Sequence, residues 1–66
     1  MKTTKELYGI EPEELSSMLY VDAIKYKIFK SKTLITELQE IHYMDRDDYR
    51  INELLKAVEF NKQLLS

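Results

Sequence analysis

Three aspartates in the middle of the chain, Asp45, Asp47 and Asp48, are the residues whose type and spacing come closest to a metal site. A calcium-binding EF-hand loop needs ligands at alternating positions, a central glycine and a glutamate at its twelfth position. The glycine is missing here, and a helical pattern begins directly after the aspartates. Acidic residues at a helix N-terminus cap its free N–H groups and complement its dipole. We therefore expect helix capping and no metal.

His42 is the one histidine, and Glu40 and Asp45 are near enough in sequence to orient an imidazole. General acid–base catalysis also needs a pocket and a second positioned group, which a short helical chain does not obviously supply. The sequence contains no glycine-rich phosphate loop, no nucleophile-elbow serine and no cysteine. We expect a half-exposed histidine near a helix C-terminus, no enzymatic activity and no cofactor.

A run of alternating bases and aromatics suggests a third chemistry, contact with nucleic acid. On a helix, however, its lysines point to at least two sides, so they do not form one row that could follow a phosphate backbone. The net charge of −2 and the pI of about 5.3 give no general attraction to nucleic acid or to an anionic membrane. We expect a partner with an acidic surface before nucleic acid, and keep a nucleic-acid-associated regulator as a further alternative. The lysines of this run are Lys25, Lys27, Lys30 and Lys32.

Two amphipathic helices must position all of these residues. Apolar side chains recur every three or four residues in two stretches, which predicts one helix from about 12 to about 42 and a second from about 46 to about 64. Pro12 and the acidic residues around it favour the start of the first helix at about residue 12, and Asp45 or Asp47 would cap the second helix. The fold class is an all-α antiparallel two-helix hairpin, one domain over residues 1–66. Its stripes are Val21, Ile24, Ile28, Ser31, Ile35 and Leu38, and then Ile51, Leu54, Leu55, Val58 and Leu65.

An N-terminal arm, residues 1–11, carries a small helical signal of its own. Thr3 followed by Glu6 is a capping-box pattern, and Gly9 stands where a helix C-terminal cap would lie. These residues predict a short helical turn, and fraying is the alternative because so short a helix cannot hold itself.

The unequal lengths of the two helices point to a contact surface. At 1.5 Å per residue they would measure about 46 Å and about 28 Å, leaving roughly 18 Å of the first helix uncovered. In the N-terminal half of the first helix, further apolar residues lie mostly opposite the main stripe. This pattern predicts that this half of the helix is buried on two faces. They form either core and self-association surface or the binding face for a foreign protein. These residues are Leu15, Met18, Leu19, Tyr26 and Phe29.

Three residues of the second helix add to this prediction. Tyr49 and Phe60 point away from its stripe and form a secondary surface with Glu53 and Lys56 between them. Asn61 interrupts the stripe, and a single amide at such a position can fix the register of paired helices. The alternative is that the helix end frays and Asn61 meets water.

A chain of 66 residues without cysteine is small enough to need oligomerisation or a partner for stability. We expect a non-enzymatic regulatory or adaptor protein that forms a homodimer, built as a four-helix bundle, and binds another, unidentified protein. The alternative is an assembly component of a larger symmetric particle, for example one encoded by a phage. No stretch is apolar over the roughly 20 residues that span a bilayer, and we expect a cytoplasmic protein. In size and layout the chain resembles, in type rather than in motif, small helical regulators of low-GC Gram-positive bacteria and their phages.

Overall fold

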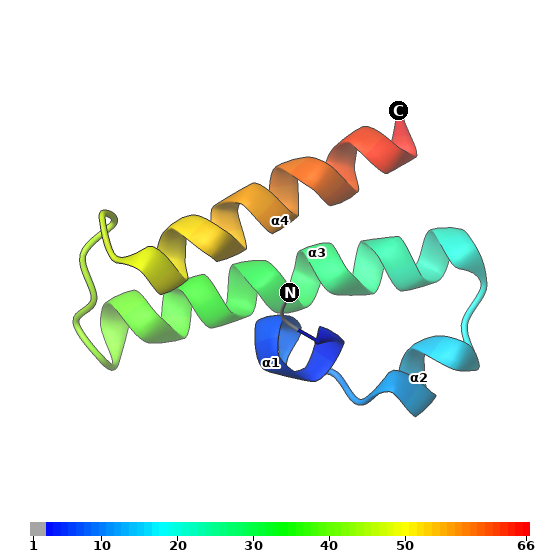
Figure 1. Cartoon of the computed structure of the whole chain (residues 1–66), viewed down its shortest axis with the longest axis horizontal. Coiled ribbons are helices and arrows are strands. Elements are labelled where there is room, and N and C mark those ends of the chain that lie inside the picture. Colours follow the sequence, from blue (N-terminus) through cyan, green and yellow to red (C-terminus); the bar gives the residue numbers. More distant parts are fainter. Residues whose placement is uncertain (1–2) are drawn as a thin grey trace.

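The computed structural model describes residues 3–66, and over that part the chain is entirely helical apart from its connections. Its helices are α1 (Thr4–Tyr8), α2 (Pro12–Ser16), α3 (Tyr20–Glu40) and α4 (Tyr49–Leu65). The two long helices, α3 and α4, run in opposite directions and pack together, and the short ones lie beside α3 (Figure 1). The predicted all-α helical hairpin is confirmed. Residues 1 and 2 of the predicted arm lie outside the described residues.

Helix α1 forms as its sequence predicts. The backbone N–H of Glu6 donates to the Thr3 hydroxyl at 3.1 Å. Gly9 closes the other end in the left-handed region, at φ +71°, and its N–H donates to the carbonyl of Lys5. The predicted capping residues are thus confirmed. Five residues are too few for a stable isolated helix, so α1 depends on contacts with the rest of the chain.

The predicted continuous helix from 12 to 42 is wrong over residues 12–19. It ends at Ser16, reverses direction over residues 17–19 and restarts at Tyr20 as α3. The 46 Å helix and its uncovered end therefore do not exist in a molecule whose longest dimension is 34 Å. Periodicity could not reveal this break, because the apolar contacts that accompany the reversal come from residues before it: Ile10 is buried, and partly buried Leu15 packs against the same cluster. From Tyr20 onward the helix is continuous as predicted.

Helix α4 begins later than predicted and has a different cap. The Asp48 carboxylate accepts the backbone N–H of Arg50 at 2.9 Å, so the prediction of Asp45 or Asp47 as cap is wrong. The turn before it contains Tyr43 at φ +55°, a left-handed conformation that is uncommon for a residue with a side chain.

The core has two parts. The long helices pack together, and their buried apolar residues include Ile24 on α3 and Ile51, Leu54 and Val58 on α4. Val21, which the predicted stripe includes, is instead 47% exposed. The second part is the cluster under α1, made of Tyr8, Ile10 and Ala57. Within residues 3–66, none of the helices has the length and apolar character needed to cross a membrane.

Candidate functional site

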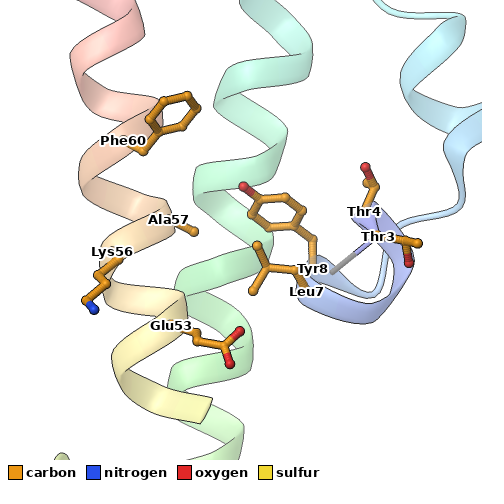
Figure 2. Close-up of a pocket in the computed structure, with 8 residues that line it drawn as sticks. All are labelled: Thr3, Thr4, Leu7, Tyr8, Glu53, Lys56, Ala57 and Phe60. Atoms are coloured by element: carbon orange, nitrogen blue, oxygen red, sulfur yellow. The ribbon is translucent and has the colours of Figure 1, made fainter. Parts of the chain in front are cut away.

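An open groove of about 400 Å³ lies between α1 and α4 (Figure 2). Its floor is apolar, and Glu53 and Lys56 bring charge to its α4 side. The lining residues are Thr3, Thr4, Leu7, Tyr8, Glu53, Lys56, Ala57 and Phe60. An open apolar groove of this size suits one or two apolar side chains of another molecule.

Helix geometry explains the α4 wall. Glu53, Lys56 and Phe60 are separated by three and four residues, so they share one side of the helix. Tyr49, one turn before Glu53, continues the same side, and its hydrogen bond to Glu53 raises the pKa of its hydroxyl. The secondary surface predicted from Tyr49 and Phe60 is thus a continuous line, of which Phe60 reaches the groove.

Three polar contacts fix α1, the other wall. The Asn61 side-chain NH₂ donates to the Tyr8 hydroxyl at 3.0 Å, and an Arg50 N–H donates to the carbonyl of Leu7 at 2.9 Å. The Lys27 ammonium stands 5.9 Å from the centre of the Tyr8 ring, within range of a cation–π interaction. Because these partners come from both α3 and α4, α1 bridges the hairpin.

Asn61 is buried, with 1% of its surface exposed, so the alternative of a frayed, hydrated Asn61 is wrong. Besides Tyr8, its NH₂ donates to the carbonyl of Ala57 at 2.8 Å. Its carbonyl oxygen is buried with no hydrogen-bond partner among residues 3–66. Within one chain Asn61 therefore anchors the N-terminal region, and its role in fixing the register of a dimer stays a prediction.

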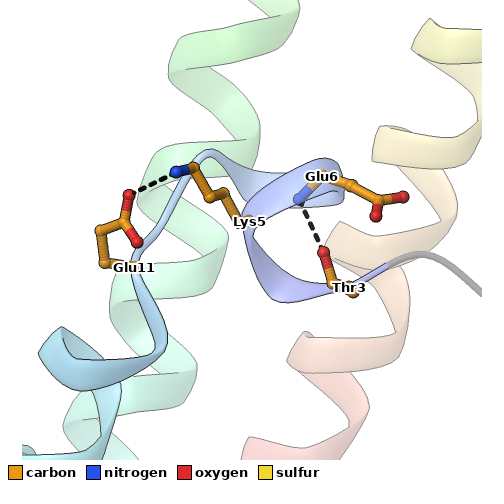
Figure 3. Close-up of polar contacts among 4 residues, drawn as sticks. All are labelled: Thr3, Lys5, Glu6 and Glu11. Atoms are coloured by element: carbon orange, nitrogen blue, oxygen red, sulfur yellow. Dashed lines mark hydrogen bonds and ion pairs between the residues drawn. The ribbon is translucent and has the colours of Figure 1, made fainter.

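Beyond α1 the chain is held by exposed polar contacts. Lys5 and Glu11 form an ion pair at 2.9 Å across the Gly9 turn, and this hydrogen bond raises the pKa of the Lys5 ammonium (Figure 3). The Tyr26 hydroxyl donates to the Glu14 carboxylate at 3.2 Å and ties α2 to α3. Burial, and then the Glu14 charge, raise the pKa of Tyr26.

The five apolar residues predicted as one face are divided by the fold. Leu15 and Tyr26 pack against the cluster under α1. Met18 is half-buried in the reversal between α2 and α3. Leu19 and Phe29 are 75% and 62% exposed. Only part of the predicted face is thus open to a partner.

Several residues that shape the site carry no strong sequence signal. Leu7, Tyr8 and Ile10 come from a segment whose short length hides any periodicity. Ala57 is small and marks a close approach between helices, which a stripe of large apolar residues does not reveal. Away from the groove, Ile41 and Tyr43 are 64% and 84% exposed in the turn between α3 and α4, and they lie outside both stripes.

The other candidate chemistries are a metal site, a catalytic His42 and a basic surface formed by the lysine run. Within residues 3–66, no group of three or more His, Asp or Glu side chains is placed to hold a metal ion. His42 is exposed after the end of α3. Of the lysine run, Lys27 faces Tyr8, whereas Lys25 and Lys32 are exposed. The groove with its adjoining apolar side chains therefore remains the best-formed candidate site.

No protein-family model, curated protein or solved structure matches this chain.

Proposed function

We propose that this chain is a non-enzymatic interaction protein that works as a homodimer and binds another protein through its exposed apolar side chains. The observation that carries the proposal is the distribution of large apolar residues. Among residues 3–66, eleven are exposed, whereas the buried core contains seven hydrophobic residues. A fold that leaves more large apolar side chains in water than it buries gains stability when a second surface covers them.

The total surface supports the same proposal. The chain exposes 4908 Å², whereas a folded monomer of 7.9 kDa is expected to expose about 4400 Å². Domains of this size often need oligomerisation, disulfides or a metal for stability. The chain has no cysteine, so self-association is the support that its composition favours.

The groove offers a place for the second protein. Phe60 is 61% exposed at its edge, and Leu7 and Ala57 lie in its floor (Figure 2). An amphipathic helix of a partner could insert an apolar side chain here and cover Phe60, as helices do in hydrophobic grooves. Glu53 and Lys56 would then contact its polar residues.

Two measurements test the proposal. Sedimentation equilibrium at micromolar concentration should give twice the mass of one chain, and a stable folded monomer would contradict the homodimer. Mass that keeps growing with concentration would instead favour the alternative of an assembly component.

Affinity capture tests the second part. Protein from the native host should be retained by the wild type and by Gln63→Glu, and lost with Phe60→Glu. Gln63 is exposed on the same helix, so this control adds the same charge outside the groove. Equal retention by both variants would contradict a binding role for the groove.

A further inference from the structure

The reversal between α2 and α3 lacks the residues that normally end a helix. The chain has one glycine and one proline, Gly9 and Pro12, and neither lies in the reversal, because Gly9 precedes α2 and Pro12 is its first residue. The N-cap residue of α3 is Leu19, whose side chain makes no capping hydrogen bond. Leucine is among the poorest N-cap residues. The local sequence therefore favours a helix that continues through residues 17–19.

Contacts at a distance hold the reversal. They join the N-terminal segment, which we define as residues 3–16, to the hairpin α3–α4. Ile10 is fully buried, the Tyr8 hydroxyl accepts from Asn61, and the Glu14 carboxylate accepts from Tyr26. None of these contacts depends on the two partners belonging to the same chain.

We infer that the homodimer is domain-swapped: residues 17–19 join α2 and α3 into one helix, and the N-terminal segment packs on the hairpin of the second copy. This inference rests on the proposed homodimer. The burial of Ile10 and the Tyr8–Asn61 and Glu14–Tyr26 hydrogen bonds are kept, now between protomers, so the exchange does not lose them. The N–H groups of the first three residues of α3, which have no helical acceptors in the reversed chain, gain the carbonyls of residues 16–18.

Tyr20→Pro is the variant that separates the two conformations. In the reversed chain Tyr20 is the first residue of α3, where proline is favoured, and it is 67% exposed. Leu19 already has φ −67° and ψ 155°, the conformation that a following proline requires. In a continuous helix the same proline would lie in the interior, where it removes a hydrogen bond and clashes with the preceding turn. Tyr20→Ala is the matched control because alanine suits both conformations.

Sedimentation equilibrium gives the result. We expect the wild type and Tyr20→Ala to be dimers, and Tyr20→Pro to be a folded monomer whose dimerisation is weaker by on the order of a hundredfold or more. If Tyr20→Pro dimerises as well as Tyr20→Ala, the swap is wrong and the homodimer stands. If the wild type is a monomer, the proposed homodimer itself fails, and the swap with it.

Cross-linking keeps the test decisive if Tyr20→Pro does not fold. Because the chain has no cysteine, a Thr4→Cys, Lys56→Cys double variant carries one thiol on each wall of the groove. A short thiol-specific cross-linker applied to the dimer should give covalently joined pairs of chains on a denaturing gel. Single chains linked only to themselves, from a sample that sediments as a dimer, would overturn the swap.

Discussion

The α3–α4 hairpin and the N-terminal segment are stabilised in different ways. The hairpin buries a repeating stripe, of which Ile24 on α3 and Ile51, Leu54 and Val58 on α4 are buried. The N-terminal segment has two helices of five residues each, and it is attached by one small apolar cluster around Tyr8 and Ile10 and by a few polar contacts. Stability in the hairpin is spread over many residues, whereas in the segment it depends on a few.

This difference suggests that the segment can detach while the hairpin persists. Proteins open locally where buried apolar contacts are few, at a lower free energy than global unfolding requires. The reversal at residues 17–19 is the natural hinge for such opening. Variants in the two regions should therefore have distinct effects.

The largest effect is expected in the hairpin. Leu54→Ala removes a fully buried side chain and should cost about 2–5 kcal/mol. A chain of 66 residues has a free energy of unfolding of roughly 3–10 kcal/mol. The variant should therefore lose its helical circular dichroism signal at a lower temperature than the wild type does. Leu55→Ala is the matched control because Leu55 is 38% exposed. Equal destabilisation by both would contradict the assigned core.

A smaller and local effect is expected at Gly9. Its φ of +71° is strained for any residue with a Cβ, although an added Cβ would meet nothing within 4 Å. Gly9→Ala should therefore cost about 1–2 kcal/mol through backbone conformation alone. Hydrogen exchange measures the effect: we expect the amides of α1 to exchange faster than in the wild type, and those of α4 to exchange at the same rate. Gly9→Asn should be milder, because asparagine tolerates this conformation.

Tyr8→Phe tests the hydrogen bond that joins α1 to α4. The ring keeps its packing, and the Asn61 NH₂ keeps the carbonyl of Ala57, so the loss should be about 0.5–1.5 kcal/mol. Thermal unfolding measures it. Tyr20→Phe removes an exposed hydroxyl in the same way and should be neutral. No difference between the two variants would mean that the Tyr8 hydroxyl does not anchor α1.

The smallest effect concerns pH. The pKa of Tyr26 is raised in the folded chain by burial and by Glu14, above an unfolded value of about 10. Its contribution to stability is therefore complete below pH 10 and is lost as the pH rises through the folded pKa. Glu14→Gln should lower the pKa of Tyr26, as followed by NMR of its ring protons, whereas Glu13→Gln should not. Identical titration in both variants would rule out the contact with Glu14.

The sequence predicts the hairpin well because a repeating stripe reports many equivalent contacts at once. The capping residues of α1 were also predictable, since Thr3, Glu6 and Gly9 act through local hydrogen bonds. The reversal at residues 17–19 was not predictable from the sequence, because it depends on the burial of Ile10, which is distant from it in sequence. The groove depends on that reversal, which is why only its α4 wall, with Phe60, could be anticipated.

Native-state hydrogen exchange tests most directly whether the two regions open separately. The amides of Leu7 and Gly9, bonded to the carbonyls of Thr3 and Lys5, report on α1. Those of buried Leu54 and Val58 report on the hairpin. We expect the α1 amides to exchange through an opening of lower free energy, with little dependence on denaturant. A single opening free energy shared by all four amides would contradict this account.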